Sequence, residues 1–433
     1  MTDRPLKQIH LAAHFPGVNN TTVWTDPQSR SQIEFSSFRH LAETAERGLF
    51  DFLFLAEGLR LREVKGRIHD LDVVGRPESI TVLNALAAVT GRLGLAATVN
   101  ATFNEPYELA RRFASLDHLS GGRAAWNVVT SSDAFTGENF RRGGYLDRAD
   151  RYTRAAEFVQ LAREFWDAEG DTVRHRGPQF DVEGRLSLPR PPQGHPVVIQ
   201  AGDSDEGREF AAATADVVFS RHSTLAAGQA FHADVKRRLA AYGRKPDELK
   251  IMPGVTYVLG DTEAEAAERA AEIRRAQVGP LTAIAHLEQI WGIDLSGHDP
   301  DGPLPAADPV VDSTVVQGRT RLGDPREIAA RWRAVAAEKR LTSRELVIEV
   351  TGRQSFVGTP EAVAAQLDAH VQSDAADGFI LVPHLTPGGL DEFVDRVVPL
   401  LQERGVFRTE YTGTTLREHL GLPVPGLPVP ARR

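Results

Sequence analysis

Short apolar runs alternate along the chain with longer stretches in which apolar residues recur every three or four positions. The short runs predict strands that are buried on both faces, and the longer stretches predict amphipathic helices. The predicted strands cover residues 8–15, 50–57, 93–99, 122–130, 197–201, 216–221, 249–259 and 377–383. The predicted helices cover residues 33–48, 79–90, a stretch from Pro106, a stretch from Tyr152 to Trp166, and residues 205–214, 224–241, 262–276 and 390–401.

Strands and helices therefore follow one another in about eight β–α units, without consecutive hairpins. That order predicts an α/β protein with a parallel sheet, either doubly wound or closed into a (β/α)8 TIM barrel, and the number of units favours the barrel. We expect one barrel domain over residues 1–422 with insertions near 170–196, as a loop or hairpin, and near 277–325, as a long excursion. The proline-rich residues 423–433 are expected to form an extended arm.

The amino-acid composition of the chain argues against several classes of function. Among 433 residues, 50 Lys and Arg stand against 59 Asp and Glu, which gives a formal net charge of −9. A negative balance disfavours a dedicated binder of nucleic acid or of anionic membranes. The chain has no cysteine, which excludes disulfides and thiolate metal sites, and its 14 histidines show no HExxH metal pattern. No apolar run is long enough to span a membrane and no signal-peptide pattern occurs, so we expect a cytoplasmic protein.

In a barrel of this kind, ligand sites lie at the carboxyl ends of the strands. Polar residues fall at several of these ends, namely His14, Glu57, Thr98, Asn100, Asn127, Thr130, Gln200, Arg221 and His222. For any single one of them, structural capping and a role in binding are equally good explanations. Polar residues at many strand ends are nevertheless what a ligand site in this fold requires.

The sharpest local motif is QAGDSDEGREFAA, residues 200–212, in which an apolar strand runs through a short turn into a helix. The N–H groups at a helix N-terminus, with Ser204 and Arg208 nearby, suit a phosphate. Local chemistry alone favours a simpler explanation, in which Asp203 or Ser204 caps the helix. The chain has no GxGxxG motif opening a βαβ unit, no Walker A motif and no GxSxG motif, which argues against dinucleotide, P-loop and nucleophile-elbow sites.

Five long segments closely resemble one family. They are TFNEPYELARRFASLDHLSGGRAAWNVVTS (102–131), DRYTRAAEFVQLAREFW (150–166), QAGDSDEGREFAA (200–212), VGTPEAVAAQL (357–367) and ERGVFRTEYTGTTLREHLGLPVP (403–425). The family is the branch of the bacterial luciferase-like FMN-dependent monooxygenases that includes nitrilotriacetate monooxygenase, dibenzothiophene-sulfone monooxygenase, pristinamycin IIA synthase and long-chain alkane monooxygenase. The resemblance spans nearly the whole chain.

The resemblance implies a (β/α)8 barrel that binds reduced FMN supplied by a separate NAD(P)H:flavin reductase. With O2, such an enzyme inserts one oxygen atom into a small organic substrate at a C–N, C–S or C–H bond, and the other oxygen leaves as water. No metal, nucleic acid or membrane is implied, and homodimers or homotetramers are common in the family. Two alternatives stay open: an F420-dependent hydride-transfer enzyme on the same barrel, and a non-catalytic flavin-binding relative.

By match to the family pattern, four residues are expected to line the flavin, namely Glu57, Thr98, Asn100 and Asn127. Four more are expected around its phosphate, namely Arg148, Tyr152, Asp203 and Ser204. Many members have a histidine where this chain has Arg148, and an arginine can also pair with a phosphate. Members often have two further histidines in a segment that corresponds here to residues 19–27, where this chain has none. No catalytic residue is therefore assigned.

Overall fold

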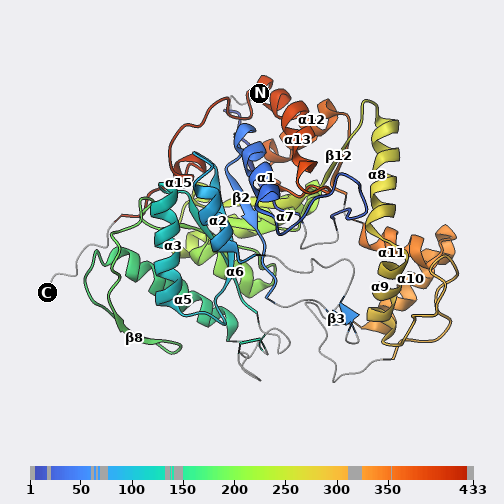
Figure 1. Cartoon of the computed structure of the whole chain (residues 1–433), viewed down its shortest axis with the longest axis horizontal. Helices are drawn as coiled ribbons and strands as arrows, with labels where there is room; N and C mark the ends of the chain where they lie inside the picture. Colours follow the sequence, from blue (N-terminus) through green and yellow to red (C-terminus); the bar gives the residue numbers. More distant parts are fainter. Residues whose placement is uncertain are drawn as a thin grey trace.

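A computed structural model describes residues 5–16, 21–59, 77–131, 137, 139–140, 150–310, 324–352 and 354–426, and the backbone of 63–64 and 67–68. Eight parallel strands close into a barrel that is surrounded by helices (Figure 1), which confirms the predicted (β/α)8 fold. The barrel strands are β1 (His10–His14), β2 (Phe52–Leu55), β5 (Gly94–Asn100), β6 (Ala124–Val129), β9 (Val197–Gln200), β10 (Val217–Ser220), β11 (Lys250–Val255) and β14 (Gly378–Leu381).

Helices on the outside connect successive strands. The first six strands are followed by α1 (Phe35–Arg47), α2 (Ser79–Ala87), α3 (Pro106–Ser120), α5 (Arg151–Asp167), α6 (Asp205–Thr214) and α7 (Leu225–Leu239). The last two units contain β12 (Tyr257–Leu259), α8 (Glu263–Gln277), β13 (Phe356–Gly358), α12 (Pro360–Gln372), α13 (Asp391–Arg396) and α14 (Val398–Glu403). Short 3-10 helices span Ala240–Tyr242, Pro246–Glu248 and Gly388–Leu390. In the part of the chain that the structure describes, no helix has both the length and the apolar character to cross a membrane.

The apolar residues of the barrel wall divide between its two sides. Ala12, Phe52 and Ile199 face the inside and form one buried cluster. Leu53 and Leu95 face the surrounding helices and belong to a larger cluster. Successive side chains of a strand point to opposite faces, so a strand buried on both sides has an almost continuous apolar sequence. This double burial is the reason that the apolar runs predicted the barrel strands.

The C-terminal part of the chain closes the amino-terminal end of the barrel. Leu416 and Leu420, at and just beyond α15 (Leu416–His419), join the cluster inside the barrel. Arg417 is buried, and its Nη2 lies 2.9 Å from Oδ2 of Asp216, the residue before β10. Burial raises the pKa of the Asp216 carboxyl, but the guanidinium of Arg417 and a second arginine outweigh this effect and hold the pKa below its ordinary value. Among the described residues, the interior of the barrel is thus filled at its amino-terminal end.

Both predicted insertions contain regular structure. The segment near 170–196 holds an antiparallel hairpin of β7 (Val173–Arg176) and β8 (Asp181–Gly184), one of the two forms expected there. The segment near 277–325 contains α9 (Pro280–Trp291), a helix that the sequence interpretation did not anticipate. A short antiparallel pair, β3 (Glu63–Val64) and β4 (Arg67–Ile68), also lies outside the barrel.

The helix α9 belongs to a helical group beside the barrel (Figure 1). It packs with α10 (Pro325–Lys339) and α11 (Ser343–Thr351) around a core of its own, in which Trp291 and Trp332 lie 6.2 Å apart between ring centres. The second insertion is therefore a packed helical unit in its described part. Residues 427–433 of the predicted C-terminal arm lie outside the described residues.

Two predicted elements differ from the structure. The strand predicted over 249–259 is two strands, because β11 stays in the barrel while β12 leaves it and pairs with β13. The helix predicted over 390–401 is interrupted at Val397, between α13 and α14. Pro399 explains this break, because proline has no N–H to donate and its ring clashes with the carbonyl group four residues earlier.

Candidate functional site

Two polar side chains meet inside the barrel near the carboxyl ends of adjacent strands. Thr98 of β5 lies in register with Asn127 of β6, and Asn127 Nδ2 donates to Thr98 Oγ1 at 3.0 Å. Both residues are buried. Among the described residues, Asn127 Oδ1 has no hydrogen-bond partner. A buried acceptor is costly unless water or a ligand donates to it, so Asn127 marks the wall of a candidate site.

The other two residues expected to line the flavin lie at the ends of β5 and β2. Asn100 is buried, and its Oδ1 accepts from the backbone N–H groups of Thr102 at 2.6 Å and Phe103 at 3.2 Å. Its Nδ2 donates to Ser131 Oγ. The Asn100 side chain therefore holds the turn that follows β5. Glu57 lies partly buried, two residues beyond the end of β2.

The turn after β9 lies against the hydroxyl group of Tyr152. A Cβ atom on Gly202 would lie 2.6 Å from Tyr152 Oη, and one on Gly207 would lie 2.8 Å from the same oxygen. Only glycine leaves room at these two positions, so the backbone of the turn approaches the hydroxyl directly. Tyr152 comes from the first turn of α5, and its ring packs against Phe210 of α6. The structure thus places Tyr152 beside the turn that contains Ser204.

Ser204 is the N-cap of α6. Its Oγ accepts a hydrogen bond from the backbone N–H of Gly207 at 3.2 Å. A serine hydroxyl can accept and donate at once, and the Ser204 hydroxyl also bonds the exposed Glu206 carboxylate, whose pKa this contact helps to lower and which an anion would replace as the acceptor. The free N–H groups of the first helical turn and the helix dipole add positive potential at the same place. The capping and phosphate explanations for Ser204 are therefore compatible.

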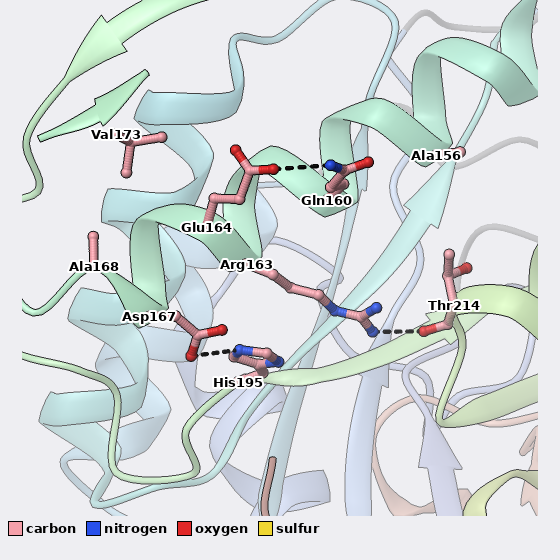
Figure 2. Close-up of a pocket in the computed structure, with 9 residues that line it drawn as sticks. All are labelled: Ala156, Gln160, Arg163, Glu164, Asp167, Ala168, Val173, His195 and Thr214. Carbon is pink, nitrogen blue, oxygen red and sulfur yellow. Dashed lines mark hydrogen bonds and ion pairs between the residues drawn. The ribbon is translucent and has the colours of Figure 1, made fainter. Parts of the chain in front are cut away.

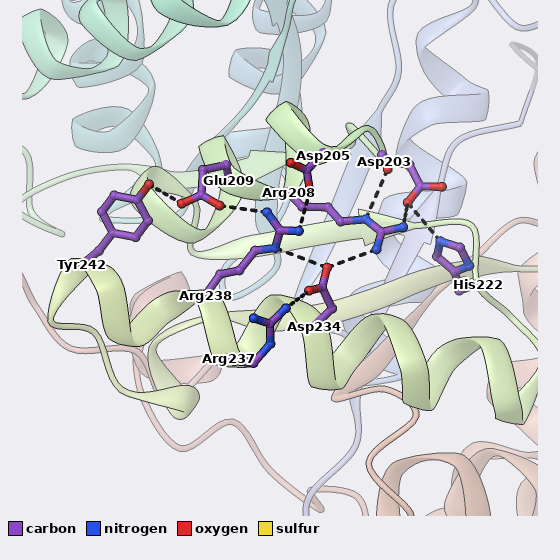
Figure 3. A network of polar contacts seen from close by, with 9 residues as sticks. All are labelled: Asp203, Asp205, Arg208, Glu209, His222, Asp234, Arg237, Arg238 and Tyr242. Atoms are coloured by element: carbon purple, nitrogen blue, oxygen red, sulfur yellow. Dashed lines mark hydrogen bonds and ion pairs between the residues drawn. The ribbon is translucent and has the colours of Figure 1, made fainter.

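Asp203 belongs to a charged network that joins three elements (Figure 3). Its Oδ1 accepts hydrogen bonds from Arg208 Nη2 and from His222 Nε2, both at 3.0 Å. Arg208 also donates to Asp234 Oδ2 of α7 at 3.1 Å. Burial raises the pKa of the Asp203 carboxyl, but His222 and Arg208 outweigh this effect and hold the pKa below its ordinary value. Asp203 is therefore an ionised carboxylate that is turned toward cations.

Arg148 lies outside the described residues, so its predicted role stays a prediction. Sequence reasoning missed Arg151, whose guanidinium carbon lies 4.7 Å from the centre of the Tyr152 ring. It also left Gln200 out of the predicted flavin contacts. This residue is buried, its Nε2 approaches Gly202, and its Oε1 has no partner among the described residues. Both residues could have been proposed from their positions in the sequence. Arg151 directly precedes Tyr152, and Gln200 is the last residue of β9, just before the turn.

A cavity of about 610 Å³ lies elsewhere, on the outside of the barrel (Figure 2). Asp167 at the end of α5, Thr214 at the end of α6 and His195 before β9 line it, which places it toward the amino-terminal ends of the strands. Arg163 extends across the cavity, and its Nη2 donates to the Thr214 carbonyl oxygen at 2.7 Å. A cation at that position stabilises the C-terminus of α6. This cavity is therefore separate from the candidate site at the carboxyl ends.

Residues 18–378 match the family model described as luciferase-like monooxygenase. The chain belongs to this luciferase-like family. It is 41% identical over 445 residues to N-acetyl-S-(2-succino)cysteine monooxygenase of Bacillus subtilis (strain 168), with 97% of this chain and 98% of that protein covered. It is also 41% identical over 430 residues to nitrilotriacetate monooxygenase component A of Aminobacter aminovorans, with 92% of each covered. The solved structure of EDTA monooxygenase from Chelativorans sp. BNC1 superposes with a TM-score of 0.76 at 30% identity, with 98% of this chain and 100% of that chain covered.

These similarities confirm the family, the barrel and the class of activity that the sequence predicted. The chain is an FMN-dependent luciferase-like monooxygenase that acts on a small substrate. The three relatives named above are all monooxygenases, so they lend no support to the alternative of an F420-dependent hydride transfer.

Proposed function

We propose that this luciferase-like chain is the oxygenase component of a two-component system and receives reduced FMN from a separate NAD(P)H:flavin reductase. The relative named nitrilotriacetate monooxygenase component A supports a division of labour between proteins. The missing GxGxxG motif agrees with a nicotinamide site on another chain. The observation that carries the proposal is the glycine turn before α6 that lies against Tyr152 Oη, because it brings the hydroxyl groups of Tyr152 and Ser204 close to the first N–H groups of α6, and all of these are donors that a phosphate accepts.

The phosphate end of FMN fits the N-terminus of α6. Backbone N–H groups of the first helical turn and the hydroxyl groups of Ser204 and Tyr152 are donors that a phosphate monoester accepts. Within the described residues, the Tyr152 hydroxyl makes no hydrogen bond that would compete. Asp205, an acidic residue of that first turn, is well exposed and pairs with Arg238 of α7. The site can therefore receive an anion although acidic residues surround it.

The ring end of FMN fits the inner wall of the barrel at Asn127. The Asn127 amide already donates to Thr98, so its oxygen is left to accept from an N–H of a planar polar ring. Asn127 is buried, and elsewhere inside the barrel Phe54 and Phe219 stack with ring centres 5.5 Å apart. A hydrogen bond is stronger in such a low dielectric than in water. Reduced FMN supplies the activation of O2 when bound, while the chain orients the ring and the substrate and keeps water out.

The proposed substrate is a small organic molecule with an oxidisable C–N, C–S or C–H bond. The named relatives act on a thioether-bearing cysteine derivative and on the amine nitrilotriacetate, according to their names. We propose that the insertion containing α9 shapes the substrate pocket. A cytoplasmic location and assembly into homodimers or homotetramers also stay predictions.

The test supplies reduced FMN from an independent NADH:flavin reductase under ¹⁸O2 and offers N-acetyl-S-(2-succino)cysteine, nitrilotriacetate and a dialkyl sulfone. The proposal predicts a product of at least one of them with a single ¹⁸O atom, and none when the reductase is omitted. Flavin oxidation that leaves all three compounds unconsumed, or carbonyl products that stay unlabelled when they are trapped before their oxygen exchanges with water, would contradict it. A Ser204→Ala, Tyr152→Phe double variant serves as the control for turnover at the proposed flavin site.

A further inference from the structure

We propose that the cavity outside the barrel that Arg163 crosses, here named the outer cavity, is a second ligand site: Arg163 binds the carboxylate of a small organic acid, and the apolar part of the acid lies along α5. Such a site is independent of the flavin site, because it lies toward the opposite ends of the barrel strands.

The outer cavity follows one face of α5 (Figure 2). The residues that this helix and its C-cap contribute recur at the spacing of residues that share a helix face, and they are Ala156, Gln160, Arg163, Glu164, Asp167 and Ala168. The first and the last of them are 12 positions apart, which is about 18 Å along a helix. The volume of about 610 Å³ lies in the range of cavities that bind small molecules.

The two acidic residues that line the outer cavity already have partners. Asp167 Oδ1 accepts hydrogen bonds from Nε and Nη2 of Arg190, both at 3.1 Å. Burial raises the pKa of the Asp167 carboxyl, but a neighbouring histidine and Arg190 outweigh this effect and hold the pKa below its ordinary value. Glu164 Oε2 lies 3.0 Å from Nδ1 of His175. Both carboxylates are therefore held by side chains other than Arg163.

Arg163 itself forms no ion pair within the part of the chain that the structure describes. It is partly buried, its Nη2 donates to the Thr214 carbonyl oxygen at 2.7 Å, and its Nε is buried without a hydrogen-bond partner among the described residues. Burial lowers the pKa of the guanidinium, and the charges of Asp216 and Asp167 do not offset this effect. A guanidinium nevertheless stays charged at physiological pH. Arg163 is therefore a cation that an anionic ligand would compensate.

The neighbouring space supplies no anion for Arg163 either. A smaller cavity of about 290 Å³ shares Arg163 with the outer cavity and is also lined by Arg244 and Arg417. These two arginines have carboxylates of their own, because Arg417 Nη2 lies 2.9 Å from Asp216 Oδ2 and Arg244 Nε lies 4.0 Å from Glu248 Oε2. The positive charge of Arg163 is thus the unmatched one among the described residues of the two cavities.

The chemistry of the outer cavity favours a monocarboxylate with an apolar body. One unmatched positive charge suits a monoanion better than a phosphate monoester, which carries about two negative charges at neutral pH. The planar guanidinium presents N–H groups in a fork that fits the two oxygen atoms of a carboxylate. Ala156, Ala168 and Val173 add apolar walls, so burial of methylene groups against them stabilises the complex. The cap of α6 uses Nη2 of Arg163 and leaves Nε for the ligand.

The experiment measures the Kd of hexanoate for the full chain by isothermal titration calorimetry at constant ionic strength. Acetate, which lacks the apolar body, and hexanol, which lacks the charge, are titrated in parallel. Arg163→Gln removes the guanidinium. Gln160→Glu keeps it and the cap of α6, and places a competing carboxylate three positions before Arg163 on the same helix face.

Two controls separate binding at Arg163 from other effects. Arg344→Gln is the matched arginine variant, because Arg344 likewise donates to carbonyl groups at the end of a helix, namely those of Val278 at 2.7 Å and Arg275 at 2.9 Å at the end of α8. The Ser204→Ala, Tyr152→Phe double variant changes the proposed flavin site and leaves the outer cavity intact.

We expect the wild-type protein to bind hexanoate saturably and more tightly than acetate or hexanol. Arg163→Gln and Gln160→Glu should each raise the Kd at least about tenfold, the effect of losing one hydrogen bond between charged groups. Arg344→Gln and the double variant should keep the wild-type Kd.

The inference is overturned if the wild-type protein does not bind hexanoate saturably, or if Gln160→Glu binds it like the wild-type protein. Because Gln160→Glu leaves the cap of α6 in place, it decides the outcome even if Arg163→Gln does not fold. Binding that is lost in the double variant but kept in Arg163→Gln would place hexanoate at the flavin site and would also overturn the inference.

Discussion

A double variant, Ser204→Ala with Tyr152→Phe, removes the two hydroxyl groups beside the N-terminus of α6 and leaves their carbon frameworks in place. Ser204 caps α6 through Gly207 N–H at 3.2 Å, and Tyr152 Oη lies against the same turn. If both hydroxyl groups donate to the FMN phosphate, their loss removes two hydrogen bonds to a charged acceptor. Each such bond contributes about 1.5–3 kcal/mol.

The lower bound for two bonds is about 3 kcal/mol, which corresponds to a rise in the Kd of reduced FMN on the order of 100-fold. Part of this loss comes from the cap itself, since replacing a serine N-cap by alanine costs about 1 kcal/mol. Thr262→Ala tests whether the loss of a helix cap elsewhere in the chain changes the affinity for FMN. It removes a comparable cap, Thr262 Oγ1 to Glu265 N–H at 3.1 Å, from the surface helix α8.

The assay is an anaerobic fluorescence titration of each protein with photoreduced FMN and, separately, with reduced riboflavin. We expect the double variant to lose affinity for FMN but to keep its affinity for riboflavin, and Thr262→Ala to behave like the wild-type protein toward both. A folded double variant that binds FMN within about threefold of the wild-type Kd would refute the phosphate assignment, because about 3 kcal/mol could not then reside in these groups.

Three further predictions concern residues outside the candidate site. Arg417→Met should lower the free energy of unfolding by about 3–5 kcal/mol in urea melts, because it removes the ion pair of the buried Asp216 carboxylate, and Asp216→Asn in the same chain should recover part of the loss. Deletion of the chain after Leu422 should leave the Kd of reduced FMN unchanged, since the described part of that segment, residues 423–426, lies against Arg190 and Arg417, away from the candidate site; loss of binding would be the contrary result. Burial lowers the pKa of His175, but hydrogen bonds with two glutamates of α5 outweigh this effect and raise it, so its contribution to stability is full below about pH 6.5 and is lost as the pH rises through the raised value. His175→Gln should therefore flatten the fall in melting temperature between pH 6 and pH 8, and an unchanged slope would contradict this explanation.

The sequence was sufficient to predict the barrel strands, because a strand that is buried on both faces has an apolar residue at almost every position. The run Phe52–Leu55 is apolar at every position, and all four residues are buried. The helical unit α9–α11 was harder to predict from the sequence. The segment before α10 is rich in proline and glycine, and the core of the unit depends on the contact of Trp291 with Trp332, 41 positions later. Such a meeting is a tertiary contact that local periodicity does not report.

In the candidate site as well, the sequence predicts what depends on neighbouring residues, but not what depends on tertiary contacts. Ser204 at a helix start could be recognised from the turn that precedes it, since capping is a local property. The approach of Tyr152 Oη to Gly202 and Gly207 joins residues 50 and 55 positions apart, and only the packing of α5 on α6 reveals it. Likewise, local sequence does not show that Thr98 of the neighbouring strand bonds Asn127 Nδ2, which leaves Asn127 Oδ1 without a partner among the described residues.

The most direct test of the central claim is an anaerobic titration of the purified protein with photoreduced FMN, followed by rapid mixing of the complex with O2 in a stopped-flow spectrometer. The account predicts a saturable complex and, after mixing, a transient absorbance that free reduced FMN does not give. Reduced FMN that fails to bind, or that oxidises in the presence of the protein as it does in buffer alone, would contradict it.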